Sequence, residues 1–254
     1  MPENDRAGES YWNDVWSGRS EIPPIDIEYY TYAKLHGLFK KFLPGKPGLS
    51  LLEIGAAFSS FLPYFHKYFH YKVSGLDYED EAAKRTEALY KESGIQASIH
   101  HRDFFETTPF PLYDVLTSFG VFEHFENLPA SIAQTRHYLR PNGTIVTVIP
   151  NMNGLVGWLQ KSFNRAVYDI HIPYRKEDLL QAHEKAGYTT LFCDYFGTYQ
   201  GGVVNLSGHP REKVWQKILA APGKPMHLLE TILGKRLDGV FHSPYVIYIG
   251  TLGE

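Results

Sequence analysis

The stretch LLEIGAAFSSF, from Leu51 to Phe61, decides the fold class of this 254-residue chain. An apolar run ends in a glycine and a turn of small residues, which is typical of a buried strand that turns sharply beside a ligand. Gly55, Ala57 and Ser59 stand where such a loop would usually hold three glycines. Gly55 matters most, because the first position needs unusual dihedrals and close backbone approach. The stretch therefore predicts the first strand and turn of an α/β fold.

Composition excludes several classes of protein. The net charge is -3 with basic and acidic residues interspersed, so no patch is expected for a phosphate backbone or an anionic membrane. The N-terminal MPENDRAGES does not resemble a secretion signal, and no apolar run approaches the ~20 residues of a bilayer span. The single cysteine, Cys193, rules out intramolecular disulfides and thiolate-cluster metal sites. We expect a cytoplasmic protein without nucleic-acid or membrane partners, and a homo-oligomer is left open.

Short apolar runs alternate with helical patterns after Pro47. Predicted helices between the runs end at Gly94 and Gly187, which are suited to helix C-termini. This alternation predicts a mostly parallel sheet covered by helices on both faces. The predicted strands are LSLLEIG, YKVSGLD, IQASIH, YDVLTSF, GTIVTVIP, TTLFCDYF and PYVIYIGTL.

Three segments lie outside this alternation. The arm YWNDVWSGRSEIPP, from Tyr11 to Pro24, is interrupted by glycine and proline but rich in aromatic residues, and an amphipathic helix is predicted between it and Pro44. Insertions at about 151–174 and 197–243 follow the fifth and sixth predicted strands. Long loops at strand ends usually carry function, so we expect both insertions to form pocket walls.

Two aspartates follow the next two predicted strands. Asp77 comes ~20 residues after the turn, where a carboxylate can accept hydrogen bonds from both ribose hydroxyls of a nucleoside. Asp103 follows the third strand and can accept from an adenine amino group, while Phe104 supplies a backbone amide to the ring. Each aspartate alone could instead be a helix cap or a solvated loop charge. Their order along successive strands favours an adenosine-containing cofactor.

The passage YDVLTSFGVFEHFENLPASIAQTRHYLRPNGTIVTVIPN resembles the region between the fourth and fifth strands of class I S-adenosylmethionine-dependent methyltransferases of the small-molecule type, similar to the quinone-pathway and methyltransferase-11-like group. In that family an acidic residue precedes the glycine turn, as Glu53 does here, and an LRPNG turn precedes the fifth strand. Similarity covers about residues 49–195 and returns at PYVIYIGTL. The resemblance implies a Rossmann-like α/β fold with a seven-stranded, mostly parallel sheet of order 3-2-1-4-5-7-6 and an antiparallel seventh strand.

The resemblance also implies the cofactor, S-adenosylmethionine, with S-adenosylhomocysteine as product. This methyl donor has no pyrophosphate, so the loss of two glycines from the turn is less damaging than in a dinucleotide site. The expected cofactor residues are Glu53, Gly55, Ala56, Ala57, Ser59, Asp77, Tyr78, Asp103, Phe104, Phe119 and Gly120.

Methyl transfer from a sulfonium is a direct displacement, so the protein mainly aligns the reactants and deprotonates the acceptor where necessary. His124 in FGVFEHF and His171 in YDIHIPY are the candidate catalytic bases, although Glu123 and His124 could also be a polar pair at a helix start. Expected acceptor contacts are Tyr11, Trp12, Glu123 and Tyr174. No metal site is expected, because Gly120 stands where similar quinone-pathway enzymes carry a further acidic ligand.

We therefore expect one methyltransferase domain over 1–254 that methylates oxygen or nitrogen of a small organic molecule. Residues 1–46 would form an arm and helix acting as a lid, 47–150 a cofactor-binding half, and 151–254 a substrate-side half. A non-catalytic methyltransferase-like binding protein is one alternative, and an NAD-dependent enzyme is disfavoured by Glu53. A C-methyltransferase or cyclopropane-type lipid enzyme is another, weakened by Pro150-Asn151 and by the lack of an N-terminal cysteine.

Overall fold

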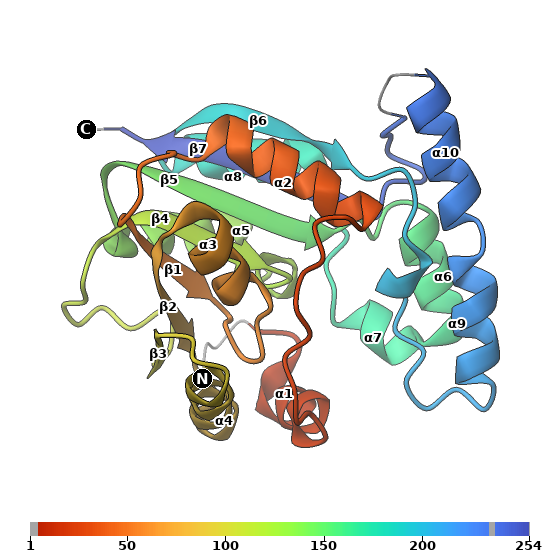
Figure 1. The fold of residues 1–254 in the computed structure, drawn as a ribbon, viewed down its shortest axis with the longest axis horizontal. Coiled ribbons are helices and arrows are strands. Elements are labelled where there is room, and N and C mark those ends of the chain that lie inside the picture. The colour runs from red at the N-terminus through yellow and green to blue at the C-terminus, as the bar shows by residue number, and fades with distance from the viewer. Residues whose placement is uncertain (1–4, 234–236, 254) are drawn as a thin grey trace.

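The computed structural model describes residues 5–233 and 237–253, built around a seven-stranded sheet (Figure 1). The strand order is β3-β2-β1-β4-β5-β7-β6, and β7 runs antiparallel to both β5 and β6. The predicted Rossmann-like fold, strand order and antiparallel last strand are therefore confirmed. The strands are β1 (Ser50–Ile54), β2 (Lys72–Asp77), β3 (Ala97–His101), β4 (Tyr113–Phe119), β5 (Leu139–Pro150), β6 (Tyr188–Phe196) and β7 (Tyr245–Leu252).

Helices connect most consecutive strands, as the alternating pattern predicts, whereas β3 and β4 are joined by a loop. Three further short 3₁₀ turns are η1 (Phe122–His124), η2 (Thr135–Tyr138) and η3 (Gly201–Val203). No helix in the described ranges is long and apolar enough to cross a bilayer. The helices are α1 (Gly8–Ser17), α2 (Tyr30–Phe42), α3 (Phe61–Phe69), α4 (Asp80–Glu92), α5 (Leu128–Gln134), α6 (Leu155–Phe163), α7 (Arg165–Asp169), α8 (Lys176–Lys185), α9 (Glu212–Ala220) and α10 (Gly223–Leu233).

Two apolar clusters bury the two faces of the sheet. On one face, Phe39 of α2 and Phe65 of α3 pack with Leu51 of β1, and α2 and α3 lie in front of the sheet in Figure 1. On the other face, Ile132 of α5 and Leu179 of α8 pack in a second cluster. Burial of both faces explains why the central strands are continuous apolar runs rather than alternating ones.

The strand β5 is longer than its sequence predicts. LRPNG was expected to form a turn before the strand, yet Leu139 to Gly143 belong to β5. Asn142 adopts a left-handed φ of 61°, and the pairing of β4 with β5 shifts register between Tyr113 and Val115. At this irregularity the chain bends while the segment still belongs to the strand. Asparagine tolerates the left-handed conformation better than most residues.

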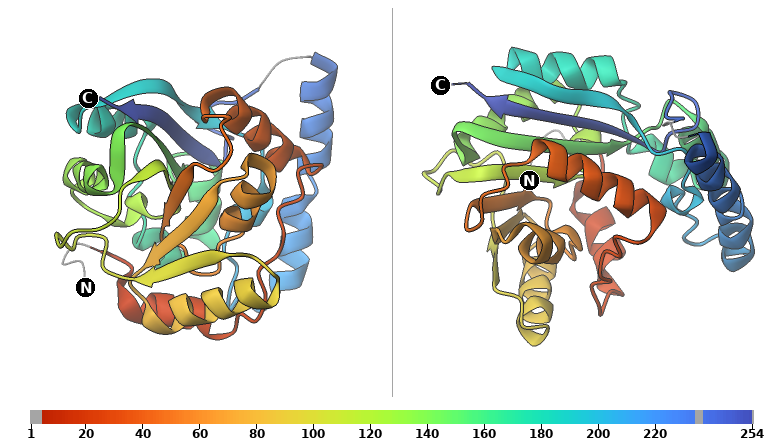
Figure 2. Two further views of the ribbon diagram at one scale, coloured as in Figure 1. Left: turned by 60° about the vertical axis from the view of Figure 1, so that its left-hand side comes forward. Right: turned by 45° about the horizontal axis from the view of Figure 1, so that its top comes forward.

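Both insertions fold into helices next to the sheet. The segment 151–174 forms α6 and α7, and the segment 197–243 contains η3, α9 and α10. These helices gather beyond the carboxyl end of β5 in Figure 1, and the right-hand view of Figure 2 shows the same grouping for α6, α9 and α10. The helix α1 includes the first residues of the arm, Tyr11 to Ser17, and ends before Gly18, ahead of the glycine and proline interruptions.

Candidate active site

The turn after β1 depends on Gly55. This residue has a φ of +71°, which only glycine adopts without strain. A Cβ added there would lie 2.6 Å from Val121 Cγ2. The amides of Gly55 and Ala56 donate to the Leu76 carbonyl at 2.9 and 3.2 Å, which ties the turn to β2. The first glycine of the motif is therefore kept because the backbone requires it.

Side-chain acceptors hold the part of the turn that lacks glycine. The Ala57 amide donates to Asp77 Oδ2 at 2.9 Å, and the Phe58 amide donates to Thr86 Oγ1 at 2.9 Å. Ser59 Oγ accepts from the Phe61 amide at 3.0 Å, where α3 begins. Phe58 itself has a φ of 51° and packs its ring inward. The turn thus keeps a closed shape through these hydrogen bonds instead of through glycine.

A cavity of about 280 Å³ lies beside this turn. Of the predicted cofactor residues, only Ala56 is absent from its lining. Ala56 is fully buried, and it lies so close to Gly75 that a Cβ on Gly75 would meet its side chain. Ala56 is thus a core residue that shapes the turn from behind. The predicted residues that line the cavity are Glu53, Gly55, Ala57, Ser59, Asp77, Tyr78, Asp103, Phe104, Phe119 and Gly120.

Two buried carboxylates give this cavity its acceptors. Burial raises the pKa of Asp77 to about 6, although its Oδ1 and Oδ2 accept from the amides of Glu79 and Ala57. Burial also raises the pKa of Glu53 to about 8, and its Oε2 has no hydrogen-bond partner among the described residues. Asp103 Oδ1 accepts from the Phe105 amide at 2.8 Å, which caps the loop after β3. The cavity therefore suits a ligand that brings several hydrogen-bond donors.

The N-terminal arm covers this cavity. The Arg6 amide donates to the His124 carbonyl at 3.0 Å, and Asp5 forms an isolated bridge with Phe125. In α1, the Trp12 ring meets the edge of His124 at 5.3 Å and the Trp16 ring stacks on Phe58 at 5.6 Å. Trp16 lines the cavity although it was not predicted as a site residue, and its place in the aromatic arm was the available signal.

We expect the arm to act as a lid. When S-adenosylhomocysteine is added, amide hydrogen exchange should slow in residues 5–24, because the aromatic side chains gain contacts and α1 is held in place. The measurement is exchange followed by mass spectrometry with and without the ligand. Protection that stays confined to the central sheet would count against a lid.

A second cavity, of about 500 Å³, adjoins the first. The two share six lining residues: Trp12, Tyr32, Phe61, Phe119, Gly120 and His124. Its walls come from the arm through Tyr11, from the first insertion through Gln160 and His171, and from the second insertion through Asn205. Tyr245 at the start of β7 also lines it and was not predicted, since the closing strand gave no sign of a pocket residue.

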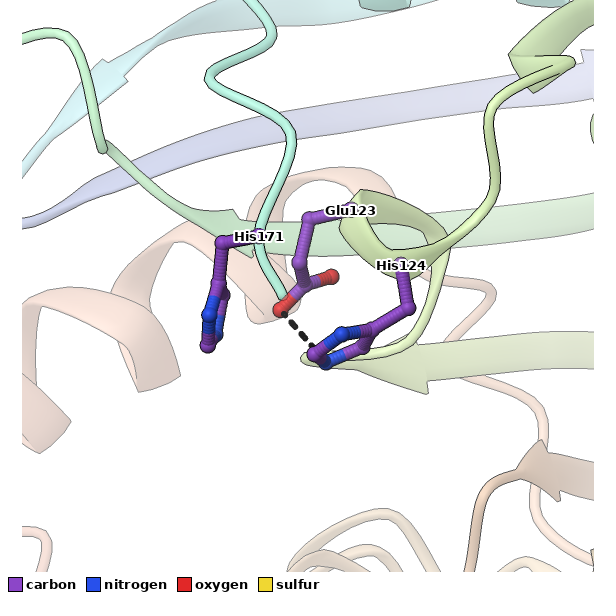
Figure 3. A group of neighbouring side chains, drawn as sticks. All are labelled: Glu123, His124 and His171. Carbon is purple, nitrogen blue, oxygen red and sulfur yellow. Dashed lines mark ion pairs between the residues drawn. The ribbon is translucent and has the colours of Figure 1, made fainter. Parts of the chain in front are cut away.

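Local packing positions Glu123 and His124. Gly120 has a φ of +71° and turns the chain after β4, while Phe122 and Phe125 are buried in the core on either side. The loop after α7 is attached to η1, because the Ile172 amide donates to the Glu123 carbonyl at 2.7 Å. This attachment brings His171 from a distant part of the sequence to Glu123 and His124 (Figure 3).

Both histidines are held as neutral imidazoles. His124 Nδ1 lies 3.1 Å from the Ile170 carbonyl and His171 Nδ1 lies 2.5 Å from the Val167 carbonyl, so each Nδ1 carries the proton and donates. Burial lowers the pKa of His124 to about 3 and also lowers the pKa of His171, whereas burial raises the pKa of Glu123 to about 8. Of the two candidate bases, His124 is therefore the weaker one, with a pKa far below the ordinary pKa of an imidazole.

Two expectations about the substrate side need correction. Tyr174 lines neither cavity, because its hydroxyl donates to the carbonyls of Phe125 and Glu126 at 2.7 and 3.0 Å. No metal site was expected, because Gly120 would leave the Glu123-His124 pair without a third ligand. The structure brings His171 to that pair from another element, so the reason for that expectation is wrong. The remaining predicted contacts, Tyr11, Trp12 and Glu123, line the second cavity.

The fold and the paired cavities define a class I S-adenosylmethionine-dependent methyltransferase. Residues 27–191 match the family model described as a methyltransferase domain, which is more than half of the chain, and the chain belongs to this family. A comparison with curated proteins gives no match for this sequence.

Solved structures with the same fold share little sequence with this chain. The cyclopropane synthase MmaA2 from Mycobacterium tuberculosis is 17% identical with a TM-score of 0.60, over 94% of this chain and 88% of that one. Geranyl diphosphate C-methyltransferase from Streptomyces coelicolor is 16% identical with a TM-score of 0.59, over 95% of each chain. Phosphoethanolamine N-methyltransferase 2 from Haemonchus contortus is 16% identical with a TM-score of 0.62, over 95% of this chain and 56% of that one. At these identities the likeness concerns the fold.

Proposed function

We propose that this chain transfers the methyl group of S-adenosylmethionine to an oxygen or nitrogen atom of a small organic acceptor. The observation that supports it is the pair of adjoining cavities. The first is lined by the turn after β1, by Asp77 and by Asp103, and the second by Glu123, His124 and His171. Because the two cavities share lining residues at the end of β4, a donor bound in the first would lie next to an acceptor bound in the second.

The residues of the first cavity fit the cofactor. Asp77 and Asp103 offer carboxylate oxygens for ribose hydroxyls and an adenine amino group, and the unpartnered Oε2 of Glu53 can accept from a further donor. Gly55 lines the same cavity and lets the chain turn beside it, because its φ of +71° strains any other residue. S-adenosylmethionine, when bound, supplies a methyl group on a positively charged sulfur that makes it an electrophile.

The protein's own residues would position the acceptor and remove a proton from it. S-adenosylmethionine, held by the residues of the first cavity, would supply the methyl group, and the acceptor would lose a proton as it is methylated. His171 Nε2 would take that proton and His124 Nε2, the weaker base, would accept a hydrogen bond from the acceptor, because each Nδ1 already donates to a carbonyl. The arm over both cavities would exclude water from this step.

A binding assay and a turnover screen test this proposal. S-adenosylhomocysteine should raise the midpoint of thermal unfolding and NAD should not, because only the former fits a cavity without a pyrophosphate site. Incubation with labelled S-adenosylmethionine and mixed phenols, amines, carbon acids and lipids should then label a phenol or an amine. Labelled carbon acids or lipids would instead support the C-methyltransferase reading. Binding without turnover on any acceptor would support a non-catalytic binding protein.

Cofactor affinity should depend on pH through Asp77. Its raised pKa of about 6 belongs to the free protein, and two hydroxyl donors favour the ionised form. Affinity is therefore full above about pH 6 and falls as the pH drops below it, by up to about tenfold per pH unit. Calorimetric titration of S-adenosylhomocysteine between pH 5 and 7.5 measures this. The Asp77→Asn variant should lose the dependence, and a slope that persists in that variant would assign it to another group.

A further inference from the structure

Glu123, His124 and His171 converge in the lining of the second cavity. Their potential ligand atoms lie within 4.8 Å of one another, and within the described ranges this is the group of three such residues that could hold a metal ion. Figure 3 shows the Glu123 carboxylate between the two imidazole rings. Because the Ile172 amide is bonded to the Glu123 carbonyl, the fold itself holds the two segments together.

Both imidazoles are oriented as metal ligands are. Each Nδ1 donates to a backbone carbonyl, of Ile170 for His124 and of Val167 for His171, which leaves each Nε2 with its lone pair. Metal-bound histidines commonly donate their other N–H to a carbonyl or carboxylate in this way, and the bond fixes both tautomer and ring orientation. The two rings therefore present nitrogen lone pairs without any rearrangement of protons.

One oxygen of the carboxylate between them lacks a donor. Glu123 is 1% exposed, and its Oε2 has no hydrogen-bond partner among the described residues. Its Oε1 lies 3.9 Å from His124 Nε2, which is too far for a hydrogen bond. A buried carboxylate that faces two imidazole lone pairs is costly to leave uncompensated, and one cation would satisfy all three groups.

The geometry points to a divalent transition-metal site formed by Glu123, His124 and His171. Two imidazole nitrogens and one carboxylate suit Zn²⁺ and similar ions, whereas Mg²⁺ and Ca²⁺ prefer oxygen ligands alone. Bond lengths of about 2.0–2.2 Å place ligand atoms roughly 3–4 Å apart, and the separations here, all within 4.8 Å, need only small side-chain shifts to reach that range. The third ligand comes from the loop after α7, and not from position 120.

Three protein ligands leave at least one coordination position open, and all three residues line the second cavity. An acceptor oxygen would complete the coordination there. This step rests on the proposed function. If the acceptor oxygen binds the metal ion, the acceptor must carry an ionisable oxygen, as phenols, enols and hydroxy acids do. The ion would lower the pKa of that hydroxyl and hold it beside the first cavity. With the ion bound, both Nε2 atoms serve as ligands, and the hydroxyl would lose its proton to water instead of to an imidazole.

Metal binding is tested on the full chain without cofactor. Protein dialysed against a chelator is titrated calorimetrically with Zn²⁺, and Co²⁺ is added separately to record its visible absorption spectrum. We expect one Zn²⁺ per chain and a Co²⁺ spectrum typical of nitrogen and oxygen ligands. His171→Ala and Glu123→Gln should each weaken Zn²⁺ binding by at least about 10–100-fold, since even residues that only support ligands have effects of that size. His137→Ala, an exposed histidine on η2, should leave binding unchanged.

Two results would overturn the inference. One is the absence of stoichiometric Zn²⁺ binding by the native chain. That result would mean that a proton on the Glu123 carboxyl group, and not a metal ion, lies between the three side chains. The other is stoichiometric binding that survives both substitutions, which would place the ion elsewhere. If a variant unfolds, the Co²⁺ spectrum of the native chain decides the matter alone, and its absence counts against the site. Zinc bound without any methyl transfer would leave the site standing and refute only the proposed function.

Discussion

Replacing His171 by alanine is expected to lower the turnover number on an identified acceptor by about 10²–10⁴-fold. His171 lines the second cavity and does not line the first, so the affinity for S-adenosylhomocysteine should change little. A loss of this kind appears in kcat and in kcat/KM together, because the lost interaction belongs to the reacting acceptor. Steady-state kinetics and calorimetry on the same preparation measure both quantities.

The control for this prediction is His137→Ala, which removes an exposed imidazole from η2 and should leave the rate unchanged. His124→Ala is less selective, because His124 lines both cavities and packs against Trp12 of the arm. If His171→Ala and His124→Ala each retained full turnover, catalysis would rest on positioning alone, as is reasonable for an amine that is already neutral.

Asp77→Ala is expected to weaken S-adenosylhomocysteine binding by about 1–3 kcal/mol, or roughly 5–150-fold. Two charge-assisted hydrogen bonds to ribose are lost, and the Ala57 amide also loses its acceptor at Asp77 Oδ2. Asp80→Ala is the matched control, because Asp80 is half-exposed at the start of α4 and pairs with Lys84 instead of lining the cavity. Unchanged affinity of Asp77→Ala in calorimetry would contradict the ribose assignment.

The strand order and most of the first cavity follow from local sequence. Each predicted cofactor residue stands at the carboxyl end of a strand, and parallel strands bring those ends to one edge. Ala56 is the exception, since residues of a tight turn alternate between ligand and core, and the sequence pattern does not say which side each one faces. Asn142 shows a similar limit, because a bulge depends on how two strands pair.

The substrate side was less predictable because distant segments build it. The sequences of η1 and of the loop after α7 give no indication that these two segments lie in contact. The contact is a backbone hydrogen bond from the Ile172 amide to the Glu123 carbonyl. Backbone bonds leave no trace in residue types. Tyr174 was misplaced for the same reason, since its hydroxyl turns to the carbonyls of Phe125 and Glu126 instead of the cavity.

The central claim is that the first cavity binds S-adenosylmethionine beside an acceptor site. Calorimetric titration of the native chain with S-adenosylhomocysteine, with NAD as the comparison ligand, tests it most directly. We predict one S-adenosylhomocysteine bound per chain and no heat of binding from NAD. The absence of S-adenosylhomocysteine binding, or binding of NAD in its place, would contradict the account.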